Sequence, residues 1–208
     1  MQIIAGKFKG HIIKLPKLAC HAKGRAGRGV KIRPTSQKVK AALFNVLGGK
    51  IEGASFLELF AGSGNIGIEA ASRGAGVLTL VESNRFCIRT IEENLRHIGM
   101  RYSYGLAGLD AGKGTGTILL PLDAERALRL LCQKGRKFDF LFLDPPYYQD
   151  KLKNCLIKVC SYDILKSRSL VIAEHSKGEI LPPVFSGLRL MLTKRYGDTI
   201  LSFYEKVE

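Results

Sequence analysis

The chain has 208 residues, 46% of them hydrophobic, which suits one sizeable globular domain. It contains no run of about 18 apolar residues that could span a bilayer, and its start lacks the residue order of a secretion signal. We therefore expect a cytoplasmic protein that does not contact a membrane.

The net charge of +15 is concentrated at the beginning of the chain. Twelve lysine and arginine residues precede Glu52 and no aspartate or glutamate does, whereas the rest of the chain is nearly balanced. This asymmetry favours a polyanionic partner, most simply a nucleic acid, over a solvated basic surface without a partner. Phosphate contacts would provide affinity that falls steeply with salt, but they would not select a sequence.

The cysteines and histidines predict neither a disulfide framework nor a metal site. Five cysteines form no C-x-x-C pair, and the histidines offer no second pair of ligands at a recognised spacing. We expect free thiols and no structural metal.

The first elements are expected to be a small hairpin, a loop and a helix. Residues 3–15 alternate apolar and polar side chains around two glycines, which suits a hairpin, and a loop rich in Gly, Lys and Arg follows over 17–32. A helix is predicted within 33–49, with Thr35 or Ser36 as its cap and a glycine pair at its end.

From residue 55 onwards, apolar runs alternate with helical patterns, which is typical of an α/β protein with a parallel sheet covered on both faces. The end of the chain predicts two strands joined at Gly197-Asp198, a closing antiparallel hairpin. Strands are expected near 56–60, 77–82, 117–121, 138–143 and 169–174, and helices near 65–74, 84–98, 124–133 and 150–161.

A glycine motif lies between the first of these strands and the helix that follows it. Gly62, Gly64 and Gly67 form G-x-G-x-x-G, a spacing that permits a tight turn and the close approach of a nucleotide-bearing ligand. Glu82 follows at about the interval at which an acid binds ribose hydroxyls. A tight turn without a ligand gives the same pattern, so the motif alone is weak.

Dinucleotides and S-adenosylmethionine compete for this position. The pyrophosphate of a dinucleotide favours bare helix-terminal amides with little negative charge nearby. Here Glu58 precedes the glycines in the same strand, where it could meet the positively charged aminoacyl end of S-adenosylmethionine. Asp123 follows the third strand, where it could bind the adenine amino group, cap the next helix, or do both. Acids at successive strand ends favour the methyl donor.

The segment Asp144-Pro145-Pro146-Tyr147 follows the fourth strand and should lie over the same edge of the sheet. Asp144 and the Pro145 carbonyl can accept the two N–H groups of an exocyclic amine, whose lone pair is otherwise drawn into the base. The prolines fix φ near about −65° and so hold these acceptors in place. Tyr147 offers a face on which an extruded base can stack, although a rigid turn with a tyrosine lid is the structural alternative.

With these motifs the chain resembles the class I, S-adenosylmethionine-dependent amino-methyltransferases. Among them it is similar to the RsmD-type enzymes, which methylate the 2-amino group of a guanine in bacterial 16S ribosomal RNA. The glycine and D-P-P-Y motifs mark the superfamily, whereas "RPTSQKVKAALFNVL" and "RYGDTILSFY" point to this family. The chain departs from the family at Gln37 and Lys40, where Asp and Arg are usual.

The resemblance, which covers nearly the whole chain, implies a Rossmann-like class I methyltransferase fold. This fold has a seven-stranded, mostly parallel sheet with an antiparallel last strand, preceded here by a short N-terminal hairpin extension. The chain is accordingly divided into an N-terminal extension at 1–34, whose contact with RNA is expected from its charge, and a methyltransferase domain at 35–208. The implied donor-binding residues are Glu58, Phe60, Gly62, Gly64, Glu82 and Asp123, and the implied catalytic residues are Asp144, Pro145, Pro146 and Tyr147.

Two other functions stay open. D-P-P-Y serves the 6-amino group of adenine equally well, so an adenine methyltransferase acting on DNA or RNA is the nearest alternative. The other is a basic RNA-binding assembly factor with a vestigial donor pocket, against which Glu58, Glu82 and Asp144 argue. The expected partner is 16S ribosomal RNA, within the small subunit or an assembly intermediate, and a monomer is expected.

Overall fold

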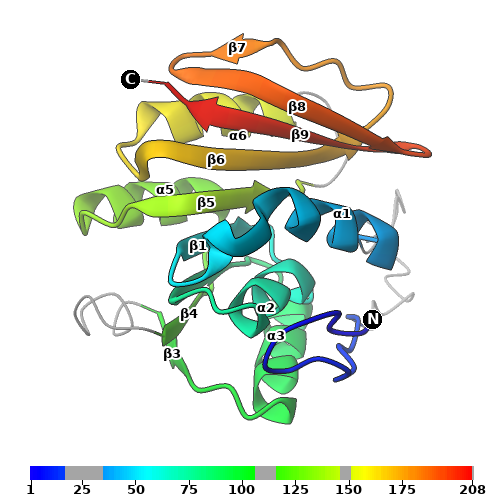
Figure 1. Ribbon diagram of the computed structural model, residues 1–208. Helices are drawn as coiled ribbons and strands as arrows, with labels where there is room; N and C mark the ends of the chain where they lie inside the picture. The colour runs from blue at the N-terminus through cyan, green and yellow to red at the C-terminus, as the bar shows by residue number, and fades with distance from the viewer. Residues whose placement is uncertain (17–34, 106–115, 146–150, 208) are drawn as a thin grey trace, which may run out of the picture.

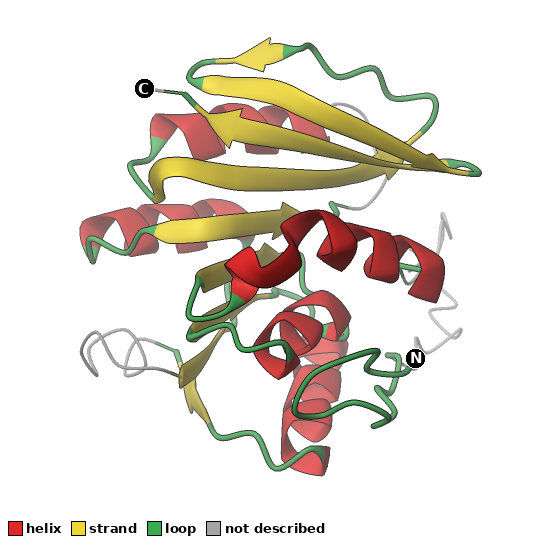
Figure 2. Ribbon diagram, viewed as in Figure 1, coloured by secondary structure: helices red, strands yellow, loops and turns green. Residues whose placement is uncertain are grey.

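The computed structural model shows a mixed sheet with helices on both of its faces (Figures 1 and 2). It describes residues 1–16, 35–105, 116–145 and 151–207. The strands are β1 Ser55–Leu59, β2 Val77–Val81, β3 Tyr102–Tyr104, β4 Gly116–Leu120, β5 Phe138–Leu143, β6 Leu165–Ser176, β7 Val184–Phe185, β8 Leu188–Tyr196 and β9 Thr199–Lys206. The helices are α1 Gln37–Leu47, α2 Asn65–Ser72, α3 Arg85–His97, α5 Ala124–Gln133 and α6 Lys151–Ser161, with a 3₁₀ turn η1 at Gly48–Ile51.

The strands lie in the order β3-β4-β2-β1-β5-β6-β9-β8-β7. The strands from β3 to β6 in this order are parallel, and β9 is inserted antiparallel between β6 and β8. The predicted α/β class, the antiparallel last strand and the closing hairpin are thereby confirmed. Because β1 has β2 on one side and β5 on the other, the direction of the strand order reverses at β1.

The described residues form nine strands rather than the predicted seven. The two additional strands, β3 and β7, are three and two residues long and lie at the two edges of the sheet. Runs this short carry no detectable alternation, which needs about four residues or more. The core of the predicted sheet is unaffected, because both additions are peripheral.

Two buried apolar clusters fill the spaces between the sheet and its helices. One lies under α1, α2 and α3 and contains Phe56 and Phe142. The other lies under α5 and α6 and contains Leu57 and Leu143. Successive residues of a strand point to opposite faces, so each central strand supplies both clusters and reads as a continuous apolar run.

The α1 helix begins and ends as predicted. Ser36 is its N-cap and accepts a hydrogen bond from the Val39 N–H at 3.3 Å. The helix ends at Leu47, and the next residue, Gly48, has a φ of 54° that favours glycine.

The N-terminal hairpin is reduced to a single antiparallel bridge between Gln2 and Ile12. Its turn lies against α2 (Figure 1), where the N–H groups of Ile4 and Ala5 donate to the Glu69 carboxylate at 2.8 and 3.1 Å. Backbone donors from the start of the chain thus satisfy a buried acid on α2.

A buried ion pair joins this segment to two helices. Lys40 of α1 lies 3.0 Å from Glu69, and both side chains are fully buried. The Lys40 Nζ also donates to the Gln2 carbonyl at 2.8 Å and to Asn65 Oδ1 at 2.9 Å. Burial lowers the pKa of Lys40, and Glu69 opposes that shift. Lys40 thus has three bonding partners in the core, Gln2, Asn65 and Glu69.

The described cysteines, Cys87, Cys132, Cys155 and Cys160, are free. Within the described ranges, no three His, Cys, Asp or Glu side chains are grouped so as to hold a metal ion. In the same ranges, no helix is both long enough and apolar enough to cross a membrane.

Candidate active site

The candidate active site lies at the carboxyl ends of the central parallel strands. The register aligns Leu59 at the end of β1 with Val81 of β2 and with Leu143 of β5. The segments that follow these three strands therefore emerge side by side (Figure 1). Open α/β sheets bind ligands at this edge, where the strand order reverses.

The loop after β1 has an unusual backbone. Gly62 and Gly64 have φ angles of 56° and 72°, and Phe60 has a φ of 59°. Phe60 is one of two non-glycine residues with positive φ in the part of the chain that the structure describes. A bulky residue in this conformation carries strain, a feature that clusters at functional sites.

The third glycine of the motif permits close packing of α2 on the sheet. A Cβ atom at Gly67 would lie 2.5 Å from Leu80 Cδ2 and 2.7 Å from Glu58 Oε2. The Gly67 N–H donates to the same Glu58 oxygen at 2.8 Å. The motif therefore has the helix–strand packing glycine that its spacing predicts.

Glu58 lies beneath the loop rather than at its surface. Its side chain is buried between β1 and the first turn of α2, where the bond from Gly67 holds it. Burial raises the pKa of Glu58 to about 8, and the nearby charge of Glu82 adds to the effect.

Glu82 connects the glycine loop to the start of α3. One of its carboxylate oxygens accepts the Gly62 N–H at 2.8 Å. The other accepts the N–H groups of Ser83 and Asn84, each at 2.8 Å. The structure thus brings Gly62 and Glu82 into contact, as their spacing in the sequence predicted.

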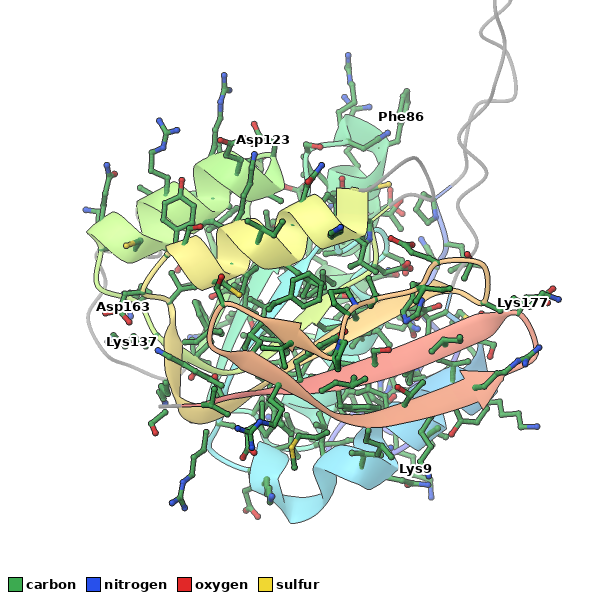
Figure 3. The ribbon with its side chains drawn as sticks, turned by 90° about the horizontal axis from the view of Figure 1, so that it is seen from above. Lys9, Phe86, Asp123, Lys137, Asp163 and Lys177 are labelled. Carbon is green, nitrogen blue, oxygen red and sulfur yellow. The ribbon has the colours of Figure 1, made fainter. Side chains whose placement is uncertain are left out.

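Asp123 caps α5, the structural role that the sequence left open. Its Oδ1 accepts the Arg126 N–H at 2.9 Å, and its Oδ2 lies 3.4 Å from Arg126 Nε. About half of its side chain is exposed (51%), so a ligand can reach it. Figure 3 shows Asp123 on the same side of the molecule as Phe86, an exposed aromatic at the start of α3.

Asp144 follows β5 directly and has two acidic neighbours. Leu143 pairs with Ala173 of β6, so the next residues, Asp144 and Glu174, are adjacent. Alternation places both on the face that carries α1, α2 and α3, where Glu58 also lies. Burial, together with the charges of Glu174 and Glu58, raises the pKa of Asp144 well above its usual range.

Sequence reasoning missed Glu174. It is buried on β6 and accepts a hydrogen bond from Thr35 Oγ1 at 2.7 Å. Its only sequence signal was an acid at the end of the predicted strand 169–174. Pro145 is buried after Asp144, and Pro146 and Tyr147 lie outside the described residues.

The electrostatics of this edge separate the two cofactor classes. Glu58, Glu82 and Asp144 surround the glycine loop at three neighbouring strand ends. A sulfonium and an ammonium group would favour the ionised forms of these acids, whereas a pyrophosphate would oppose their ionisation. The residues present therefore fit S-adenosylmethionine better than a dinucleotide.

Comparisons with known proteins identify the family to which the chain belongs. The family model described as Conserved hypothetical protein 95 matches residues 1–205. "Putative rRNA methyltransferase YlbH" of Bacillus subtilis is 32% identical over 99% of each chain. "Ribosomal RNA small subunit methyltransferase D" of Escherichia coli is 28% identical over 99% of this chain and 90% of its own. The solved structure "Putative methyltransferase yhhF from Escherichia coli" is 26% identical with a TM-score of 0.72, covering 99% of this chain and 97% of that one. The chain thus belongs to the Conserved hypothetical protein 95 family and is a methyltransferase.

Proposed function

We propose that this protein transfers a methyl group from S-adenosylmethionine to the 2-amino group of a guanine in bacterial 16S ribosomal RNA. The observation that carries the proposal is the position of Asp144 and Pro145 directly after β5, which pairs with β1, the strand that leads into the glycine loop. An amine acceptor pair and a donor cradle then share one edge of the sheet. The names of the relatives support the small-subunit RNA substrate.

The donor would be held by Phe60, Gly62 and Gly64, with acids on either side. A carboxylate can accept about four hydrogen bonds. Glu82 accepts three from the backbone N–H groups of Gly62, Ser83 and Asn84, which leaves one acceptor site for a ribose hydroxyl. Asp123 is exposed enough to bind the adenine amino group while it caps α5. Glu58 lies below the loop, where a positively charged donor would favour its ionised form.

Catalysis would come mainly from positioning. S-adenosylmethionine supplies an electrophilic methyl group on a sulfonium sulfur. Asp144 and the Pro145 carbonyl accept the two N–H groups of the target amine, which aims the nitrogen lone pair at that methyl group. The nitrogen proton would leave to Asp144 or to water, and the electrons of the broken S–C bond would stay with the departing donor.

The environment of Asp144 suits this role. Its raised pKa gives it more affinity for a proton than an ordinary carboxylate has. A positively charged donor at the same edge favours its ionised form, which accepts hydrogen bonds. Pro146 would hold the tip rigid, and Tyr147 would stack on the base.

The remaining assignments concern partners and place. We assign the basic extension 1–34 to RNA contact and 35–208 to the methyltransferase domain. The substrate would be the RNA within the small ribosomal subunit or its assembly intermediate, and the protein would act as a monomer in the cytoplasm.

The test is incubation with tritiated S-adenosylmethionine and undermethylated bacterial small subunits, followed by digestion and chromatography of the labelled nucleoside. Label in 2-methylguanosine is expected. Label in 6-methyladenosine would move the protein to the adenine alternative. Failure to bind the donor in calorimetry would favour the assembly factor instead.

A further inference from the structure

A buried carboxylate that the reaction scheme does not use lies beside the catalytic tip. Glu174 is 4% exposed and occupies the strand position next to Asp144. On its other side, β9 pairs Glu174 with Leu201. Glu174 thus lies on an interior strand of the sheet. It is near the carboxyl ends of the parallel strands, where the amine would bind.

The hydroxyl that bonds Glu174 comes from the far end of the sequence. Thr35 and Glu174 are 139 residues apart, and the Thr35 side chain is itself buried. Thr35 directly precedes Ser36, the N-cap of α1. It is therefore the first described residue after the basic loop, and it lies against the catalytic edge.

The helix that follows Thr35 is firmly held. Lys40, one turn into α1, makes the buried bonds to Gln2, Asn65 and Glu69. Anchored at Lys40 and at the bond from Thr35 to Glu174, the start of α1 has little freedom to shift relative to β6. The chain that leaves Thr35 towards the basic loop consequently starts from a fixed point.

Glu174 acts on Asp144 through its charge as well as through its place in the sheet. A glutamine there could accept the same bond from Thr35 without repelling Asp144. A like charge beside a buried acid is unfavourable, and such costs persist mainly where function uses them. The acids that act on Asp144 are Glu174 on β6 and Glu58 on β1, and Glu58 in turn faces Lys40 on α1 and Glu82 after β2.

We infer that Glu174 is a positioning residue with two roles. Through its bond to Thr35 it fixes the point where the basic segment, residues 1–34, joins the rest of the protein beside Asp144. Through its charge it tunes the protonation of Asp144. This inference rests on the proposed function. RNA bound by the basic segment is thereby held in a fixed relation to Asp144. The hydrogen bond from Thr35 to Glu174 fixes the position of Thr35, and the charge of Glu174 influences the protonation of Asp144.

Two substitutions separate these roles. Thr35→Val removes the hydroxyl at nearly constant volume, and kcat/KM for small subunits should fall at least about tenfold. Thr35→Ser keeps the hydroxyl and should leave kcat/KM close to the wild-type value. Glu174→Gln keeps an acceptor for Thr35 but removes a negative charge beside Asp144. This lowers the pKa of Asp144, so the acid limb of the pH–rate profile should move to lower pH.

Ser55 and Asp139 provide a matched control at the opposite end of β5. Ser55 Oγ donates to Asp139 Oδ2 at 2.6 Å, a hydroxyl–carboxylate bond like the one at Glu174. Ser55→Ala and Asp139→Asn should change thermal unfolding without moving kcat/KM or the acid limb. Donor affinity in calorimetry should stay the same in all variants.

The outcomes distinguish this inference from the function beneath it. If the wild-type protein labels guanine but Thr35→Val behaves like Ser55→Ala, Glu174 has only a structural role. An unmoved acid limb in Glu174→Gln would overturn the inference as well. No label with the wild-type protein would overturn the proposed function and the inference together.

Discussion

In the proposed reaction, Asp144 both orients the target amine and can receive its proton. Asp144→Ala removes one of the two acceptors that orient the amine, so turnover should fall about 10²-fold. Donor affinity should change little, because the glycine loop and Glu82 follow other strands, β1 and β2. Single-turnover methylation of small subunits and calorimetry with S-adenosylmethionine measure the two quantities. Equal turnover in the variant would remove Asp144 from the mechanism.

Glu58 makes stability depend on pH. Its pKa is raised from 4.5 to about 8, so the folded protein keeps a proton that the unfolded chain releases over this range. The wild-type protein therefore loses stability as pH rises through this window. Glu58→Gln keeps an acceptor for the Gly67 N–H and has no proton to release.

The variant should accordingly gain stability relative to wild type between about pH 5 and about pH 8. Urea unfolding at both pH values measures the difference. A difference that does not vary with pH would mean that Glu58 is ionised in the folded protein.

Among the secondary-structure elements, α2 packs so closely on β1 and β2 that only glycine fits at position 67. Gly67→Ala should cost about 1–3 kcal/mol of stability by overpacking. The added Cβ atom would displace the Leu80 and Glu58 side chains, and this displacement should also weaken donor binding. Gly49→Ala is the control, because a Cβ there meets nothing within 4 Å. Equal unfolding midpoints for the two variants would contradict the packing argument.

Elements longer than about four residues were predictable because their patterns are local. The apolar runs of β1, β2, β4 and β5 and the cap at Ser36 depend on neighbours in sequence, and they were predicted close to their observed places. The short strands β3 and β7 exist only because a longer strand lies beside each of them.

The same limit applies to the candidate site. The glycine loop and its link to Glu82 follow a known spacing, so the sequence could predict them. The burial of Glu58 depends on how α2 packs, and the bond from Thr35 to Glu174 spans 139 residues. Only the sheet register puts Glu174 beside Asp144.

Across the whole molecule, the positive charge and the acidic site are separated along the chain but joined in the fold. The acid-free segment before Glu52 carries most of the net charge of +15. The described parts on either side of residues 17–34 are fixed to the core, by Glu69 near the start of the chain and by Glu174 at Thr35. Under the proposed function, a polyanion drawn to this segment would therefore be brought to the catalytic edge of the sheet.

Salt dependence tests this arrangement. Lys23, Arg25 and Arg28 lie outside the described residues, and their charge is known from the sequence. Changing all three to glutamine should weaken RNA binding and flatten its dependence on salt. Every phosphate that the protein no longer neutralises reduces the slope of log K against log salt by roughly 0.7 to 0.9, so three such phosphates reduce it by about 2 to 3. Filter binding over a salt series measures the slope.

The control must change net charge equally but elsewhere. Arg129, Lys153 and Lys194 are exposed on α5, α6 and β8, and replacing them with glutamine also removes three positive charges. If RNA responds only to net charge, both triple variants should flatten the slope to the same extent. If the basic segment holds the phosphates, only the first variant should do so, and its donor affinity should be unchanged. An unchanged slope in the first variant would exclude these three residues from the RNA interface.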